Sequence, residues 1–246
     1  MDKNEIVLKK DFFPQFADMD ADGFIGIRGY LTYFQNAVTE YMMNLGLDGF
    51  TLFEKYGAAW VYTKYKLHIE KKARFAAMHT ESWTEKRRSA SSLLQNLAVL
   101  QNGEVCAFGK LEFCLYNFKN NRLCRISDVE YPLSAEVEKA VDIAPFARIK
   151  PNEDKGEYVY THIVRYTDLD SNHHMNNIKY ADMLLNVFGS DFYNTHFISD
   201  FEIHYMNQSY EGEKIKVYMR ISESGAAVTG EKEDGTNAAM CIMNFG

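Results

Sequence analysis

The chain has 246 residues, of which 46% are hydrophobic and 25% are charged. This composition suits one large or two small globular domains and excludes a mainly disordered, collagen-like or coiled-coil protein. The formal net charge is −7, from 34 acidic and 27 basic residues. An acidic chain argues against nucleic acid as the main partner, because phosphate binding requires a basic surface.

No segment approaches the ~20 apolar residues that span a bilayer, so we expect no membrane partner. The N-terminal sequence MDKNEIVLKKDFF carries charges where a secretory signal is apolar, and it contains no Ser/Arg-rich leader. These features predict a cytoplasmic protein, of bacterial type rather than an unprocessed plant precursor.

The cysteines form no CxxC pair and lie in apolar or strand-like sequence; they are Cys106, Cys114, Cys124 and Cys241. This placement predicts small buried hydrophobic residues, not a disulfide framework or a zinc site.

The first polar motif is DMDADGFI, in which Asp18, Asp20, Asp22 and Gly23 match an EF-hand calcium loop. The twelfth loop position, which should be a bidentate Glu, is Gly29, and Pro14 interrupts the entering helix. We therefore interpret the motif as a polar turn and not as a calcium site.

A first helix is predicted over residues 29–47, where apolar side chains recur at spacings of three and four; they are Leu31, Phe34, Val38, Tyr41 and Leu45. Gly46 is a plausible stop. Strands are expected in WVYTKYKLHIEKKARF, AAMHTESW, LLQNLAVLQ and EVCAFGKLEFCLY, the last after an Asn102-Gly103 turn. Three of the four prolines then fall in a segment of weak pattern, so we expect a linker over residues 131–156 between domains at 1–130 and 157–246.

Seven of the ten residues from 168 to 177 are polar groups of the kinds that active sites use: Asp168, Asp170, Asn172, His173, His174, Asn176 and Asn177. A helix N-cap explains one or two of them, such as Asn176, but not the whole set. A carboxylate, an amide and an imidazole beside a helix N-terminus can position a water molecule and stabilise an oxyanion. The cluster therefore indicates hydrolysis of an acyl compound. Adjacent histidines in extended chain point in opposite directions, so we expect no metal and no other cofactor.

A second helix is predicted over NNIKYADMLLNVFG, ending at Gly189 and followed by the strands FEIHYMNQSYEGEKIKVYMRI and AMCIMNF. The two halves align when Leu31-Thr32-Tyr33 is matched to Ile178-Lys179-Tyr180, and Leu67-His68-Ile69 to Ile203-His204-Tyr205. In this alignment the residues ahead of Tyr33 contain no Asp-Asn-His set, which predicts one active site per chain. Periodicity indicates a duplicated α+β fold, and a long helix across an antiparallel sheet, present twice, is typical of a double hot-dog.

The segment VRYTDLDSNHHMNNIKYADMLL closely resembles the second-domain signature of the acyl-acyl-carrier-protein thioesterases, a DxDxNxHxNNxxY run. The stretches DGFIGIRGYLTYFQNAVTEYMMNLGL and AAWVYTKYKLHI resemble the first helix and the following strand of that family. The resemblance covers nearly the whole chain. It implies a tandem double hot-dog, with two long helices against a continuous curved antiparallel sheet, and hydrolysis of long- or medium-chain acyl-carrier-protein thioesters in fatty acid biosynthesis.

Carried over by position, the resemblance places the family's catalytic residues on Asp170, Asn172 and His174. Asp170 with Asn172 would activate water or, as the alternative, attack the thioester directly to form an anhydride. His174 would orient the water or the thioester carbonyl. The Glu-Cys pair of plant members aligns with Gln208 and Ser209, and a glutamine cannot act as a general base. Gln208 would then position water through its amide.

The remaining residues of the motif are assigned to substrate binding by the same resemblance; they are Asn176, Asn177, Tyr180 and Ser209. Backbone N–H groups near Asn176 and Asn177 would hold the oxyanion. The stretch TYFQNAVTEYMM is a candidate lining for the acyl chain. The alternative is that these side chains simply pack in the hydrophobic core.

The resemblance implies an acyl carrier protein as partner and a monomer or homodimer. A carrier is acidic, and the compact basic groups available to it are Lys86, Arg87, Arg88, Arg122 and Arg125. The alternatives that stay open are an acyl-CoA thioesterase using the same residues, a hydroxyacyl dehydratase, and a non-catalytic acyl-binding protein.

Overall fold

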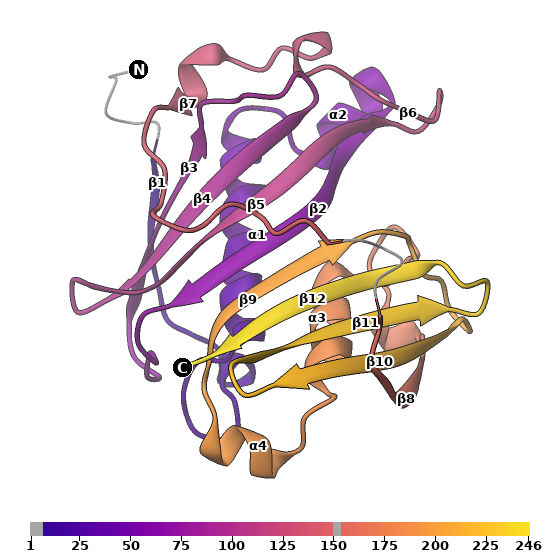
Figure 1. Ribbon diagram of the computed structural model, residues 1–246. Helices are drawn as coiled ribbons and strands as arrows, with labels where there is room; N and C mark the ends of the chain where they lie inside the picture. Colours follow the sequence, from indigo (N-terminus) through magenta and orange to yellow (C-terminus); the bar gives the residue numbers. More distant parts are fainter. Residues whose placement is uncertain (1–6, 150–153) are drawn as a thin grey trace. The chain divides into compact units, whose positions relative to one another are not determined.

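The structure, a computed structural model, describes residues 7–149 and 154–246. The chain divides into two compact units at Ala144 and Pro145, a division that lies inside the expected 131–156 linker. In each unit a helix packs on an antiparallel sheet (Figure 1). The α+β fold class predicted from the sequence is therefore confirmed, with one hot-dog in each unit.

The first unit begins with a strand and a helix and continues as a meander. Its elements are β1 (Leu8–Phe12), a 3-10 turn (Phe16–Asp18), α1 (Ile27–Asn44), α2 (Gly49–Tyr56), β2 (Ala58–Ile69), β3 (Met78–Glu85), β4 (Ser92–Gln101), β5 (Glu104–Asn117), β6 (Arg122–Leu123), 3-10 turns at Ile126–Asp128 and Leu133–Ala135, and β7 (Glu136–Val137). The strand order is β1-β3-β4-β5-β2, with β6 on β5 and β7 parallel to β3.

Helix α1 has the apolar stripe that the sequence predicts. Leu31, Phe34, Val38 and Tyr41 are all buried, and the helix ends just before Gly46, whose φ of 68° is the left-handed conformation typical of a glycine stop. The helix packs on β3 and β4 (Figure 1).

Much of the expected linker packs on the first unit. Tyr41 Oη donates to Ala135 O (2.7 Å), Trp83 Nε1 donates to Lys139 O (2.7 Å), and Val141 N donates to Asn96 Oδ1 (3.0 Å). These hydrogen bonds tie residues 135–141 to α1, β3 and β4.

The second unit repeats this plan. Its elements are β8 (Glu157–Ile163), a 3-10 turn (Tyr166–Asp168), α3 (Asn177–Leu185), α4 (Ser190–Thr195), β9 (Ile198–Tyr205), β10 (Lys214–Ser222), β11 (Gly225–Lys232) and β12 (Asn237–Phe245). The strand order is β9-β12-β11-β10-β8, and α3 packs on β11 and β12 (Figure 1).

Helix α3 is shorter than the periodic pattern predicts. It ends at Leu185, whereas apolar spacing continues to Phe188. Phe188 stacks on Phe192 of α4 with ring centroids 3.9 Å apart and meets Phe245 of β12 at 6.0 Å. The expectation of a second long helix was wrong because this aromatic contact draws Phe188 away from the helical stripe.

Strands β1, β8 and β11 were not predicted. The β11 sequence GAAVTGEK is rich in small residues with low strand propensity. One of its two glycines, Gly230, lies close to α3, since a Cβ there would be 2.8 Å from Met183 Cε.

The strand alignment between the halves is confirmed. After β2, Glu70 N and Lys71 N both donate to Cys106 O (2.9 and 3.2 Å). After β9, Met206 N and Asn207 N both donate to Ala238 O (2.9 and 3.1 Å). The shared pattern matches Ile69 to Tyr205, as the sequence predicts.

The cysteines are free thiols in the structure. Cys106, Cys124 and Cys241 are buried and Cys114 is half-buried, and burial raises the pKa of the Cys241 thiol. This confirms the prediction of small buried hydrophobic residues. Among the residues that the structure describes, no helix is both long and apolar enough to cross a bilayer.

Gly109 of β5 should be intolerant of a side chain. A Cβ there would overlap Lys66 O and lie 2.9 Å from Phe34 Cε2, so Gly109→Ala should lower the free energy of unfolding by about 1–3 kcal/mol. The matched variant Gly49→Ala, whose Cβ would meet nothing within 4 Å, should not destabilise the protein. Denaturant unfolding of both variants measures the difference, and equal stabilities would contradict this packing.

Candidate active site

Residues 169–175 form a tight loop directly before α3. Leu169 pairs with Met175 in an antiparallel bridge, Asp170 N donates to His174 O (3.0 Å), and His173 N donates to Asp170 O (3.0 Å). His173 closes the turn with a φ of 62°, a left-handed conformation that is uncommon outside glycine. The loop thus brings Asp170 and His174 next to each other.

Three anchors fix the loop in the unit. Met175 N donates to Ser209 O (2.8 Å), and Asn176 N donates to Asp168 O (2.8 Å). Asp168 Oδ2 accepts from Arg165 N (2.9 Å) and lies 3.1 Å from His162 Nε2. His162 therefore helps to fix Asp168, although nothing in its sequence context indicated a role.

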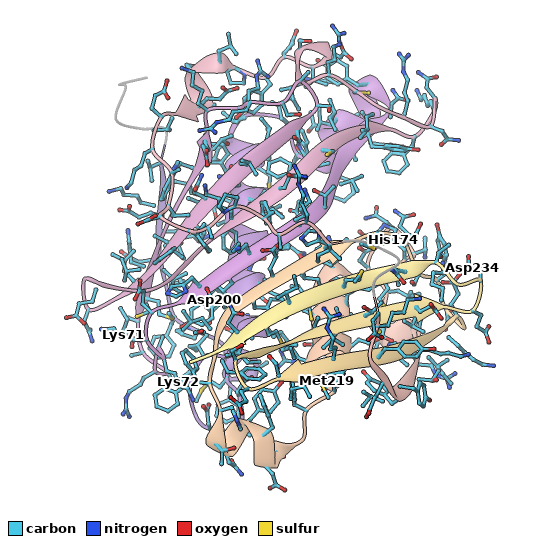
Figure 2. The ribbon with its side chains drawn as sticks, in the orientation of Figure 1. Lys71, Lys72, His174, Asp200, Met219 and Asp234 are labelled. Atoms are coloured by element: carbon cyan, nitrogen blue, oxygen red, sulfur yellow. The ribbon has the colours of Figure 1, made fainter. Side chains whose placement is uncertain are left out.

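Asp170 and His174 are the two side chains of this loop that are best suited to acid–base chemistry. Asp170 Oδ2 lies 3.6 Å from His174 Nδ1, and the two side chains are 22% and 21% exposed. Asp170 Oδ1 accepts from Asn172 N (2.8 Å), and Asn172 itself is exposed. Figure 2 shows His174 at the end of the unit where the β11–β12 hairpin carries Asp234. A carboxylate and an imidazole within reach of solvent can take and return protons.

The other histidine of the motif has a different environment. His173 is exposed, whereas His174 is partly buried against Asp170. Within residues 7–149 and 154–246, no group of three His, Cys, Asp or Glu side chains lies close enough to hold a metal ion.

Asn176 acts as the N-cap of α3. Its Oδ1 accepts from Ile178 N (2.9 Å), while its own N–H donates to Asp168 O. The N–H groups of Asn176 and Ile178 are therefore both used within the protein. The expectation that the Asn176 N–H holds an oxyanion is wrong, because that N–H donates to Asp168 O. The same expectation for the Asn177 N–H stays a prediction.

Tyr180, Ser209 and Asn177 are part of the packing that supports the loop. Tyr180 Oη donates to Asn207 O (3.4 Å), and burial raises the pKa of Tyr180 to about 12, partly offset by the adjacent Ser209. Tyr205 Oη donates to Asn177 O (3.1 Å). The Ser209 side chain is completely buried. Tyr180 and Ser209 are thus buried beneath the loop segment, whereas Asn177 is half-buried and is held through its carbonyl oxygen.

Gln208 is exposed, and its side chain bonds to a residue that the sequence did not indicate. Gln208 Oε1 accepts from Tyr210 Oη (3.0 Å), and Gln208 O accepts from Lys232 Nζ (2.8 Å). Tyr210 follows Gln208 by only two residues, but no motif distinguished it. Lys232 comes from the end of β11, a strand that the sequence did not predict.

The first unit contains the same loop at residues 19–25. Asp20 N donates to Phe24 O (2.9 Å), Gly23 N to Asp20 O (3.0 Å) and Gly26 N to Asp18 O (3.0 Å). The corresponding bonds in the second unit involve residues 150 positions later. Tyr30 is therefore the counterpart of Tyr180, and the alignment of Tyr33 with Tyr180 was wrong, because tyrosines three apart on one helix made the match ambiguous.

With the corrected register, the first unit retains part of the motif. Asp18 and Asp20 match Asp168 and Asp170, whereas Asp22 and Phe24 replace Asn172 and His174. The segment that resembled a calcium loop is thus the counterpart of the site loop. Its carboxylates have partners within the protein: Asp18 Oδ2 accepts from Tyr33 Oη (2.9 Å), and Asp22 Oδ2 pairs with Lys72 Nζ at 2.6 Å.

Two of the basic residues considered for carrier binding have acidic partners. Lys86 pairs with Glu138, and Arg87 Nε lies 3.1 Å from Glu136 Oε1. These pairs reduce the net positive charge of the 86–88 run.

Comparison with known proteins identifies the family. The model of the acyl-ACP thioesterase N-terminal domain matches residues 5–131, and that of the acyl-ACP thioesterase C-terminal domain matches residues 151–244. The chain is 25% identical over 223 residues to the chloroplastic dodecanoyl-[acyl-carrier-protein] hydrolase of Cinnamomum camphora, which covers 82% of this chain and 56% of that protein. The chain thus spans little more than half the length of this curated relative.

Solved structures show the same fold. An acyl-ACP thioesterase from Bacteroides thetaiotaomicron superimposes with a TM-score of 0.87 at 20% identity, covering 100% of both chains. The 12:0-ACP thioesterase from Umbellularia californica superimposes with a TM-score of 0.85 at 19% identity, covering 99% of this chain and 98% of its own. With both domain models matched over most of its length, the chain belongs to the acyl-ACP thioesterase family.

Proposed function

We propose that this protein hydrolyses the thioester of an acyl-acyl carrier protein and releases a free fatty acid, a reaction that ends fatty acid synthesis on the carrier. The observation that carries the proposal is the pair formed by Asp170 and His174, 3.6 Å apart in a partly exposed loop. The family of the chain supports the reaction class, and the curated relative, named for a carrier-bound dodecanoyl group, supports the carrier as the thiol partner.

In this mechanism Asp170 accepts a proton from water as the water oxygen attacks the thioester carbonyl carbon. The tetrahedral intermediate then collapses, the C–S bond breaks, and the proton returns to the departing carrier thiolate. Because a thiol has a pKa of about 8.5, the thiolate leaves with little help from an acid. In this mechanism His174 orients the water or the carbonyl, and the N–H of Asn172 aligns Asp170.

The two aspartates of the motif have different roles. Asp168 Oδ2 accepts from Arg165 N and lies next to His162 Nε2, and these contacts hold the loop in place. The Asp168 carbonyl accepts from Asn176 N. Asp170 is partly exposed and adjoins an imidazole. We assign the chemistry to Asp170 and the support of the loop to Asp168.

The acyl chain is assigned to the first unit, as the family resemblance implies. Helix α1 supplies large apolar side chains there, with Phe34, Val38 and Met42 buried on one face. Aromatic and Met side chains adapt readily to an alkyl chain.

The test of the reaction compares thiol release from an acyl-carrier-protein thioester and from the CoA thioester of the same chain length. The carrier thioester should be hydrolysed with the higher kcat/KM. Faster hydrolysis of the CoA thioester would assign the protein to the acyl-CoA thioesterases, and absence of hydrolysis with bound fatty acid would favour an acyl-binding protein.

Replacing the proposed base should abolish most of the activity. Asp170→Asn keeps an oxygen that can accept from Asn172 N but cannot take a proton, so kcat should fall about 10²- to 10⁴-fold. The melting temperature should change little because the loop hydrogen bonds remain. Retention of more than half of the wild-type rate in a folded variant would show that Asp170 is not the base.

Replacing the anchoring aspartate should loosen the loop. Asp168→Ala removes the acceptor of the Arg165 N–H, so it should cost about 1–3 kcal/mol of stability and speed hydrogen exchange at residues 165–176. Asp154→Ala is the matched control, since Asp154 Oδ1 accepts from Gly156 N in an exposed turn of the same unit. Unchanged exchange in the Asp168 variant would contradict the anchoring role.

A further inference from the structure

Gln208 lies between two residues that contact the active-site elements. On one side, Asn207 O accepts from Tyr180 Oη of α3 (3.4 Å), and on the other, Ser209 O accepts from Met175 N of the loop (2.8 Å). The backbone of Gln208 is thus held against both the helix and the loop.

The first unit shows where a side chain at this position can reach. Ile25 N donates to Ala73 O (2.9 Å), the counterpart of the bond from Met175 to Ser209, so Lys72 is the counterpart of Gln208. Lys72 Nζ extends to Asp22 Oδ2 at 2.6 Å, and Asp22 is the counterpart of Asn172 (Figure 2 labels Lys72). In the first unit, a long side chain at this position therefore reaches the loop.

The orientation of the Gln208 amide is set by its neighbour. Because Tyr210 Oη donates to Gln208 Oε1 (3.0 Å), the amide oxygen is engaged and the two N–H bonds of Nε2 face away from it. Both N–H bonds of Gln208 Nε2 are therefore directed towards an incoming substrate rather than towards Tyr210.

The ion pair between Lys232 and Glu213 holds the backbones of Gln208 and Tyr210. Lys232, whose side chain is 14% exposed, donates to Gln208 O (2.8 Å) and lies 3.0 Å from Glu213 Oε2. Glu213 Oε2 in turn accepts from Tyr210 N (3.1 Å). The backbones of Gln208 and Tyr210 are thus fixed by the same Lys–Glu pair.

The reaction needs a donor at the carbonyl oxygen, where negative charge develops. The N–H groups of Asn176 and Ile178 are already used within the protein, which leaves the Asn177 N–H and nearby side-chain donors for this role. A donor aimed at the carbonyl oxygen polarises the carbonyl group and stabilises the charge that forms there.

We propose that Gln208 Nε2 donates a hydrogen bond to the thioester carbonyl oxygen, and that Tyr210 and Lys232 are positioning residues that aim it. The inference rests on the proposed hydrolysis. It assigns Gln208 to the oxyanion, where the sequence suggested a role in placing water.

The substitution Gln208→Glu separates the two roles. A carboxylate with a pKa near 4.3 cannot donate at pH 7.5, and its charge opposes the oxyanion, so kcat should fall at least 10-fold and recover partly towards pH 5 relative to wild type. A rise in kcat at pH 7.5 would overturn the proposal, because it would mean that the position serves a base.

The role of Tyr210 is tested by a double-mutant cycle on kcat. In wild type, Tyr210→Phe should lower kcat about 5- to 10-fold with KM nearly unchanged, and in a Gln208→Ala background it should change kcat less than 2-fold. Tyr158→Phe is the matched control, since the Tyr158 hydroxyl lies 3.0 Å from Thr161 Oγ1 on β8. Equal losses in both backgrounds would assign Tyr210 a purely structural role.

The same measurements keep the two proposals apart. Absence of hydrolysis by the wild-type protein would overturn the proposed function. Wild-type hydrolysis that is indifferent to Tyr210→Phe and to Gln208→Ala would overturn only the role of Gln208.

Discussion

One of the three anchors of the active-site loop ties it to a distant part of the chain: the backbone hydrogen bond from Met175 N to Ser209 O, beyond the end of β9. It joins the loop before α3 to the segment that follows β9, so residues distant in sequence become neighbours. The first unit has the same bond between Ile25 and Ala73. A bond of this kind contributes about 1 kcal/mol and requires no particular side chain. The fold therefore fixes the loop and leaves its side chains free to vary.

The two loops show what this freedom allows. In the second unit, Asp170 and His174 lie side by side with access to solvent. In the first unit, Asp22 pairs with Lys72, and the ring of Phe24 lies 5.3 Å from both Lys72 Nζ and Arg74 Cζ. The same backbone thus supports a carboxylate–imidazole pair in one unit and an ion pair beside an aromatic ring in the other. Chemical function here resides in a few side chains, not in the fold.

The sequence predicted features that depend on local pattern. The apolar stripe of α1, its glycine stop, the Asn102-Gly103 turn and strands β2 to β5, β9, β10 and β12 agree with the structure. Strands β1, β8 and β11 and the early end of α3 were missed. Phe188 leaves the helical stripe because it stacks on Phe192, a contact between residues that periodicity does not relate.

For the site, the sequence identified the loop that carries it but not the contacts that its residues make. Seven polar residues in ten positions identified the loop, but the use of the Asn176 N–H by Asp168 could not be seen in the sequence. Lys232 and Gln208 are separated by 24 residues, and only the sheet brings them together. The counterpart loop in the first unit was misread because a tyrosine, and not the hydrogen-bonded turn, was used to align the repeats.

The central claim is that hydrolysis takes place at the loop of the second unit and not at its structural counterpart. Its most direct test compares kcat for one acyl-carrier-protein substrate in two matched variants, Asp170→Asn and Asp20→Asn, which change the same atom of the same side chain in equivalent loops. The account predicts that Asp20→Asn retains nearly the wild-type kcat while Asp170→Asn loses at least 100-fold. An equal loss in both variants, with folding intact, would contradict it.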